Sequence, residues 1–277
     1  MKRPEVYNDS YQNWKKYLNK KAQLVIADPP YALGVNMYAS SPLWYNNGSN
    51  ENGESDKAAK AAFDSDFNFH PAEFMHFCSD LLVKEPKEQG KAPCMVLFCN
   101  WEHQFQFVEL GKRYGFNHYI PLVFRKNYSP QVLKANMKVV GNCEYGLILY
   151  KEKLPKFNNN GQMVFNCMEW GRDNSVPKIH PTQKSYPLIK RLIELFTDPG
   201  DVVIDPCCGS GVALRAAYEL GREAYGFEIK KEFVKAFNEK MMANVQTDMF
   251  ASAELAAMEA ERKARIKKYV KQSKLDI

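Results

Sequence analysis

The stretch VVIDPCCGSGVALRAA, from Val202 to Ala217, constrains the fold of this chain more than any other. A short apolar strand ends at Asp205, turns through Gly209-Ser210-Gly211 and enters a helix. Glycines let the backbone approach a ligand closely, and the start of a helix offers free N–H groups. Glu228 lies at the end of the next predicted strand, near the spacing at which an acid takes ribose hydroxyls in nucleotide-binding folds. The stretch indicates an adenosine-type ligand; a tight turn beside a surface glutamate is the alternative.

Strand and helix patterns alternate along the rest of the chain. Runs of β-formers predict strands at residues 23–27, 94–99, 118–124, 145–150, 202–204 and 224–229. Apolar residues at helical spacing predict helices at 71–84, 102–114, 187–196, 212–220 and from 231 onward. Residues 151–178 show no long periodic segment. The alternation predicts an α/β fold: a Rossmann-like, doubly wound, mainly parallel sheet with helices on both faces.

The composition fits a globular enzyme, with 45% hydrophobic and 25% charged residues. No apolar run reaches the roughly 18–20 residues of a membrane span, and the N-terminus lacks the apolar core of a signal peptide. A net charge of +6 tolerates an acidic partner such as nucleic acid. The seven cysteines form no Cys-x-x-Cys pair. We therefore expect no metal, no membrane, and a cytoplasmic protein with reduced thiols.

A second strand end carries unusual chemistry, in the stretch LVIADPPYALG from Leu24 to Gly34. Pro29 and Pro30 make the turn after the strand stiff, which fixes the Asp28 carboxylate, while Tyr31 presents a ring. Acceptors beside a flat ring suit a planar substrate with an –NH2 group. Because the lone pair of an aromatic amine is delocalised, hydrogen bonds that draw its nitrogen toward tetrahedral geometry would make it more nucleophilic. An acid and two prolines that merely end a strand are the alternative.

Taken together, DPPY (Asp28–Tyr31) and DPCCGSG (Asp205–Gly211) resemble the two signature motifs of DNA amino-methyltransferases that use S-adenosyl-L-methionine. IHPTQKSYPLIKRLIE (179–194) is similar to the helix segment that precedes the glycine-rich motif in this family. VYNDSYQNW, near the start of the chain, resembles the segment that places an acid against the cofactor adenine. The catalytic motif precedes the cofactor motif, as in the β-class. The resemblance implies a class I methyltransferase fold in permuted form.

The resemblance also implies roles for individual residues. The catalytic residues would be Asp28, Pro29, Pro30 and Tyr31. The residues around the cofactor would be Asp9, Asp28, His180, Thr182, Lys184, Asp205, Pro206, Cys207, Gly209, Ser210, Gly211 and Glu228, the last through the ribose. Two positions depart from the family pattern: Cys207 stands where the family usually has Phe, and Ser185 where it has Pro.

A base inside a duplex cannot reach such a pocket, so the target would be flipped out of the stack. The polar loop at 37–66 follows Tyr31 directly, and its Trp44 and Tyr45 are candidates to contact DNA. Candidate phosphate contacts are Arg125, Lys126, Lys134 and Lys138. A solvated face is the alternative for these charges.

We expect one methyltransferase domain over residues 1–250, with DNA-facing insertions at about 37–66 and 126–178, and a charged helix over 251–277. The Asp that begins DPPY favours the N6 amine of adenine, because family members with Asp there mostly modify adenine. The alternatives are the N4 amine of cytosine, an RNA or protein-amide substrate, and a non-catalytic DNA-binding relative. Expected partners are double-stranded DNA, a second copy of the chain, and a cognate restriction enzyme.

Overall fold

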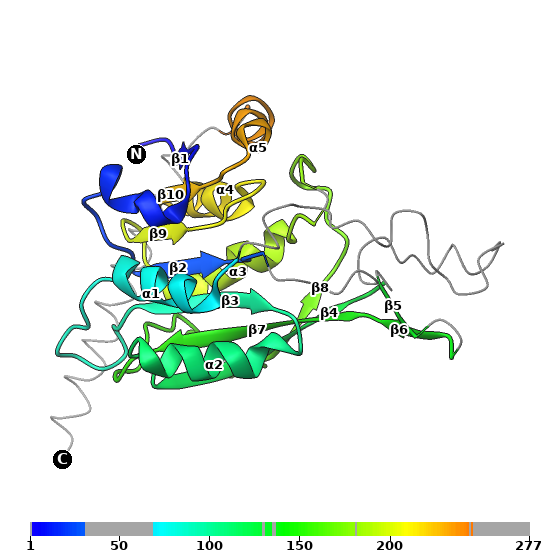
Figure 1. Ribbon diagram of the computed structural model, residues 1–277, viewed down its shortest axis with the longest axis horizontal. Coiled ribbons are helices and arrows are strands. Elements are labelled where there is room, and N and C mark those ends of the chain that lie inside the picture. Colours follow the sequence, from blue (N-terminus) through cyan, green and yellow to red (C-terminus); the bar gives the residue numbers. More distant parts are fainter. Residues whose placement is uncertain are drawn as a thin grey trace, which may run out of the picture.

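The computed structural model describes residues 2–30, 69–128, 131–134 (backbone only), 137–180, 182–243 and 245. Within these residues, eight strands form one mixed sheet in the order β1-β10-β9-β2-β3-β7-β4-β8 (Figure 1). In that order their bounds are Glu5–Tyr7, Glu223–Phe227, Val202–Asp205, Leu24–Ala27, Cys94–Cys99, Cys143–Tyr150, His118–Lys126 and Cys167–Trp170. Outside the described residues lie the predictions for Tyr31, Trp44, Tyr45, the 37–66 loop and the 251–277 helix.

The sheet is mainly parallel, as predicted. Strands β1, β10, β9, β2 and β3 run parallel to their neighbours, whereas β7 is antiparallel to both β3 and β4. A hairpin of β5 (Gln131–Lys134) and β6 (Val139–Gly141) connects β4 to β7 and projects from the sheet (Figure 1). Parallel neighbours need a long crossover connection, and a hairpin instead reverses the chain. Strand β7 therefore begins at the edge where the parallel strands end.

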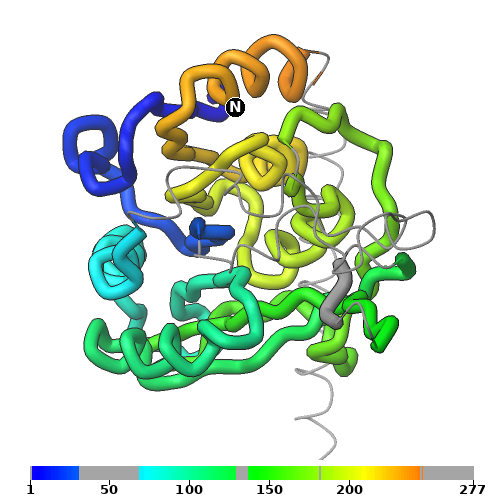
Figure 2. The backbone as a smooth tube through the Cα atoms, turned by 45° about the vertical axis from the view of Figure 1, so that its right-hand side comes forward, coloured from blue at the N-terminus to red at the C-terminus, as the bar shows by residue number. Residues whose placement is uncertain are grey.

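Helices cover both faces of the sheet (Figure 2). Their bounds are Tyr11–Lys16 for the 3-10 helix η1, Pro71–Leu81 for α1, His103–Arg113 for α2, Tyr186–Phe196 for α3, Val212–Glu219 for α4, Lys231–Ala236 for α5 and Phe237–Met241 for the π-helix η4. Core residues of α3, α4 and η4 form one cluster, and those of η1, α1 and α2 form another. Side chains of β2 alternate between them, because Leu24 and Ile26 face the first cluster and Val25 faces the second. This arrangement confirms the doubly wound α/β prediction.

Some elements differ from the sequence-based expectation. The helix predicted at 71–84 ends at Leu81, because Leu82 pairs with Ala22 and the N–H of Val83 donates to the Ala22 carbonyl at 2.9 Å. The stretch 151–178, expected without regular structure, contributes the edge strand β8. Strands β1, β5 and β6 and helix η1 also had no sequence prediction.

All seven cysteines are free thiols. In the described part of the chain, no cluster of His, Cys, Asp and Glu could hold a metal ion. No helix among the same residues is both long enough and apolar enough to cross a membrane.

Candidate active site

Three carboxylates follow the ends of three neighbouring parallel strands. Asp28 follows β2, Asp205 ends β9, and Glu228 follows β10; β9 lies between the other two strands. The charges of Asp28 and Glu228 both act on Asp205. The two sequence motifs, far apart in the chain, therefore meet at one edge of the sheet, where ligands gather in open α/β folds.

The turn after β9 owes its shape to two glycines. Gly209 and Gly211 have positive φ angles of 48° and 71°, a region that side chains rarely adopt. A Cβ on Gly211 would overlap the ring of Phe237, so η4, which carries Phe237, can pack at this position only against glycine. Within the same motif Ser210 is buried, as is Pro206. The turn presents backbone rather than side chains to the sheet edge.

Glu228 ties the end of β10 to this turn. Its Oε2 accepts a hydrogen bond from the Gly209 N–H at 2.9 Å, and its Oε1 accepts one from the Lys230 N–H at 2.8 Å. Burial raises the pKa of Glu228, while these two N–H groups oppose the rise. Asp9 lies next to this end, because the neighbouring Asn8 side chain donates to the Glu228 carbonyl at 2.9 Å.

Asp9 itself is held by local hydrogen bonds. Its Oδ1 accepts the Ser10 N–H at 2.7 Å and the Asn13 side-chain amide at 2.9 Å, and its Oδ2 accepts the Tyr17 hydroxyl at 2.8 Å. These donors hold the pKa of Asp9 below its usual value. The carboxylate therefore supports the start of η1, beside the place where the resemblance puts the cofactor adenine.

Asp205 is the most deeply buried of the three carboxylates, with 7% of its surface exposed. Burial raises its pKa to about 8; the Cys207 N–H, 3.1 Å from Oδ1, opposes this, and the charges of Asp28 and Glu228 add to it. Among the described side chains, no Lys or Arg forms an ion pair with Asp205. A positively charged ligand would stabilise the ionised form of a carboxyl that is buried in this way.

His180 packs over the glycine-rich turn. Its ring lies beside Gly209 and 4.5 Å from the Phe233 ring, centroid to centroid. Burial and the charges of Lys184 and Lys230 lower the pKa of His180 to about 4, so the ring is neutral at pH 7. Its Nδ1 accepts the Thr182 N–H at 3.3 Å, which assigns the ring proton to Nε2. His180 thus lies beside the glycine-rich turn.

Lys184 lies against the first residue of the DPPY motif. Its ammonium contacts Oδ2 of Asp28 at 2.8 Å and Oε2 of Glu144 at 3.1 Å. The other oxygen of Glu144 accepts a hydrogen bond from Lys126. Lys126, a candidate phosphate contact, is only 8% exposed. This burial favours a role inside the protein over a contact with phosphate. No role was predicted for Glu144 from the sequence. The sequence feature that could have indicated one is an acidic residue at the start of an otherwise apolar strand.

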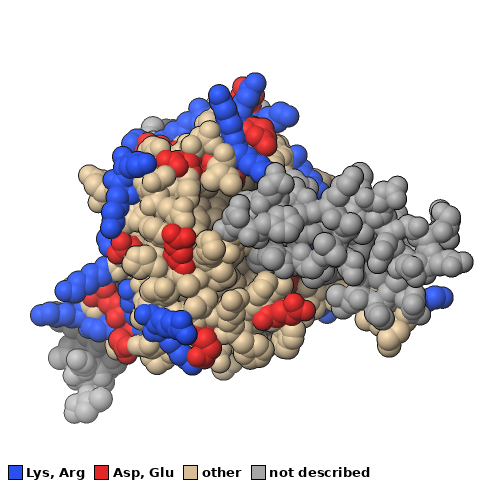
Figure 3. Space-filling view, viewed as in Figure 1, with Lys and Arg blue, Asp and Glu red and all other residues tan. Residues whose placement is uncertain are grey.

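The other candidate DNA contacts lie toward the projecting hairpin. Arg125 is exposed and ion-paired with Glu169. Lys138 is exposed and adopts a left-handed φ of 56° just before β6, while Lys134 is described only as backbone of β5. On the face shown in Figure 3, by contrast, many Lys and Arg side chains gather around α5 and the N-terminal segment. The structure does not gather all candidate basic residues into one patch.

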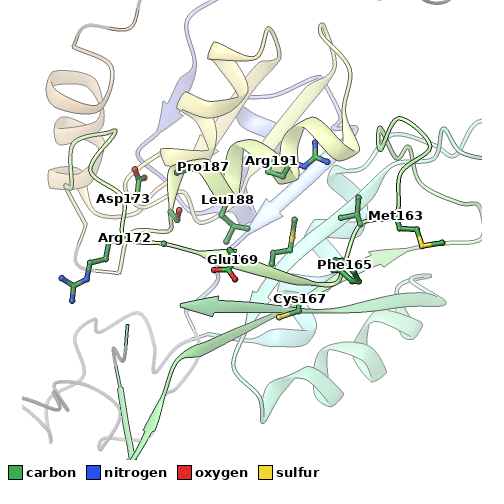
Figure 4. A pocket seen from close by; sticks show the side chains of 13 residues that line it. Met163, Phe165, Cys167, Glu169, Arg172, Asp173, Pro187, Leu188 and Arg191 are labelled. Carbon is green, nitrogen blue, oxygen red and sulfur yellow. The ribbon is translucent and has the colours of Figure 1, made fainter. Parts of the chain in front are cut away.

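A separate surface pocket of about 580 Å³ lies between β8 and α3 (Figure 4). Its lining includes Phe165, Cys167, Arg172 and Arg191. None of the three carboxylates lines it, so it is distinct from the strand ends that carry the motifs.

A sheet in this order, with a glycine-rich turn after β9 and an acid after β10, has the class I methyltransferase fold. The chain belongs to the N6/N4 family of DNA methylases, whose sequence profile matches residues 22–239. It is a DNA methyltransferase, with S-adenosylmethionine as its cofactor and DNA as its substrate.

Two curated relatives span nearly the whole chain. The DNA adenine methyltransferase YhdJ of Escherichia coli K12 is 24% identical over 293 aligned positions, which cover 98% of this chain and 92% of the relative. The type II methyltransferase M2.DpnII of Streptococcus pneumoniae is 25% identical over 257 positions, covering 88% and 91%. Such relatives are typical of restriction-modification enzymes.

Two solved structures share the fold. The complex of M1.HpyAVI with S-adenosylmethionine has a TM-score of 0.59 at 21% identity, covering 86% of this chain and 99% of that one. The cytosine-N4-specific PvuII DNA methyltransferase has a TM-score of 0.62 at 16% identity, covering 90% of each chain. At these identities the similarity concerns the fold and leaves the target base open.

Proposed function

We propose that the protein transfers a methyl group from S-adenosylmethionine to the exocyclic N6 amine of a flipped adenine in double-stranded DNA. The observation that carries this proposal is the Asp28 carboxylate, which follows β2 directly beside the glycine-rich turn after β9. The Asp at the start of DPPY supports adenine over cytosine, and so does the similarity to an enzyme named as an adenine methyltransferase.

The residues at the strand ends fit the cofactor. Asp205 is buried without a cation and has a raised pKa, which suits a ligand that carries positive charge. Gly209 and Gly211 add no side chain to the turn, and the Glu228 carboxylate beside it would accept ribose hydroxyls. When bound, the cofactor supplies a methyl group on a positively charged sulfur. His180 stays neutral at pH 7 and adds no charge repulsion against it.

The residues of the DPPY motif would act on the amine. Asp28 would accept one amino hydrogen and a proline carbonyl of the motif the other, while Tyr31 would stack on the base. These acceptors localise the lone pair on nitrogen and stabilise the positive charge that develops there. The nitrogen–methyl bond would form as the sulfur–methyl bond breaks, and the extra proton on the amine would then pass to solvent water. Extrusion of the base from the duplex brings it to this edge.

The recognition surface and partners complete the proposal. We propose that Arg125, Lys134 and Lys138, on or next to the hairpin, contact phosphates together with the 37–66 loop. A second copy of the chain and a cognate restriction enzyme are further proposed partners.

The experiment is to express the protein in cells whose DNA lacks methylated adenine and cytosine. Mass spectrometry of digested nucleosides should detect N6-methyladenine, and long-read sequencing should place it in one short sequence. Asp28→Ala serves as the matched inactive control. Methylation found only at cytosine N4 would contradict the adenine assignment while leaving the family intact.

A further inference from the structure

Four charged side chains of alternating sign form a chain that ends at the catalytic motif. In order they are Asp28, Lys184, Glu144 and Lys126. The Lys184 ammonium lies 2.8 Å from Oδ2 of Asp28 and 3.1 Å from Oε2 of Glu144. Lys126 contacts the other oxygen of Glu144. One glutamate therefore holds two ammonium groups, one on each oxygen.

The two ammonium groups are buried among aromatic rings. Lys184 and Lys126 are 9% and 8% exposed. The Trp170 ring contacts both ammonium groups, with its centroid 5.5 Å from Lys184 Nζ and 4.3 Å from Lys126 Nζ, and the Phe98 centroid lies 5.2 Å from Lys184 Nζ. Buried ammonium groups are tolerated when carboxylates compensate their positive charge. The two lysines therefore require the negative charge of Glu144.

Glu144 is ionised in this setting. Burial alone would raise its pKa, but the charges of Lys184 and Lys126 and their hydrogen bonds outweigh burial and hold the pKa below its usual value. Lys184 thus has a second negative partner besides Asp28. Without that partner, less negative charge would face Lys184, and more of the field of Asp28 at the amine would be cancelled.

We propose that Glu144, itself anchored by Lys126, is a positioning residue that holds Lys184 against Asp28 and keeps the negative charge of Asp28 available to the target amine. The inference rests on the proposed function. Asp28, Lys184 and Glu144 together carry a net charge of about −1, and Lys126 balances Glu144 from the far side. Glu144 contacts neither base nor cofactor in this role, and it acts through Lys184.

The kinetic test compares Glu144→Gln with the wild-type protein. Glutamine keeps the size of the side chain but removes the charge and one of the two acceptor oxygens. We expect kcat for DNA methylation to fall about tenfold or more, while KM for DNA and the calorimetric Kd for S-adenosylmethionine change less than about twofold. The matched control is Glu152→Gln, an exposed glutamate just past the other end of β7, which should leave all three values unchanged.

A second measurement needs no methylation. Stabilities of Asp28→Asn, Glu144→Gln and the double variant are compared by denaturant unfolding. Because the two carboxylates share one ammonium, the double variant should lose more than the two single losses added together. If Glu144→Gln does not fold, Lys126→Met, which removes the anchor on the other side of Glu144, replaces it in the kinetic measurement.

The outcomes separate the two proposals. Full kcat in Glu144→Gln, a loss of cofactor affinity equal to the loss of kcat, or strictly additive stabilities each overturn the positioning role. A wild-type protein that methylates no adenine instead overturns the proposed function, and the stability comparison still decides whether Glu144 and Asp28 are coupled.

Discussion

The backbone N–H of Gly209 donates a hydrogen bond to Oε2 of Glu228 at 2.9 Å, so one carboxylate joins the turn after β9 to the end of β10. Its other oxygen accepts the Lys230 N–H at 2.8 Å. A carboxylate oxygen has two lone pairs, so each oxygen held by one backbone donor still has a second acceptor site in a fixed direction. The pair of bonds thus leaves Glu228 able to accept the proposed ribose hydroxyls without movement of the side chain.

Glu228→Ala should weaken the binding of S-adenosylmethionine. Loss of a charged hydrogen-bond partner costs about 1–3 kcal/mol, or roughly 5–150-fold in Kd. Isothermal titration calorimetry measures the change. Glu232→Ala, an exposed glutamate in α5, is the control and should bind like the parent. Equal affinities for both variants would remove Glu228 from the cofactor site.

Asp28→Ala should abolish methyl transfer, by about a hundredfold or more, and leave cofactor binding nearly intact. Lys184 retains Glu144 as a partner at 3.1 Å, so the variant should fold. Single-turnover methylation and calorimetry on the same preparation make the comparison. Lost cofactor affinity, or substantial remaining activity, would refute the assignment of Asp28 to the amine.

The stability of the ligand-free protein should depend on Asp205. Its folded-state pKa of about 8 lies above the ordinary value of 3.8, so the folded state holds the proton more tightly than the unfolded state. This contribution is complete below the ordinary pKa and is lost as the pH rises through about 8. Asp205→Asn should therefore melt higher than the parent at pH 8 while binding the cofactor more weakly.

Thermal melts from pH 5 to about 9 follow this difference. The gap between Asp205→Asn and the parent should grow up to about pH 8, because the unfolded parent is ionised there while the folded parent keeps its proton, and should level off above it. A gap that is constant across the range would show that Asp205 titrates with its ordinary pKa.

Gly211→Ala should destabilise the protein more than Gly200→Ala. Both glycines have positive φ angles, 71° and 87°, so each substitution pays about 1–2 kcal/mol of backbone strain. Open space surrounds the Cβ position of Gly200, whereas that of Gly211 overlaps the Phe237 ring, which adds about 1–3 kcal/mol of overpacking. Urea unfolding measures both, and equal losses would mean that the Phe237 ring moves aside freely.

The sequence predicted the buried elements and missed the short strands at the edges of the sheet and in the projecting hairpin. Strand β3 matches its predicted bounds because it is an apolar run buried on both faces. Strand β6 is largely exposed and only three residues long, and β8 is an edge strand with two exposed residues, so neither shows a clear hydrophobic period.

The site shows the same limit. Motif order predicted that Asp28 and Asp205 would meet, since both end parallel strands. It did not predict that Lys184 reaches Asp28, because the length and direction of a lysine side chain depend on the packing of Phe98 and Trp170 around it. Glu144 was missed because it has no neighbouring motif, and only the reversed direction of β7 brings it to this edge.

The reversed strand has one more consequence. The β5–β6 hairpin leaves the sheet after Lys126 and returns to it just before Glu144, so both of its attachment points are members of the buried charge chain. A force on the projecting hairpin, or a change in its length, is transmitted first to these two side chains and through Lys184 to Asp28. The projecting hairpin, which we propose to contact DNA phosphates, is thus covalently continuous with the charged residues that support the Asp28 carboxylate.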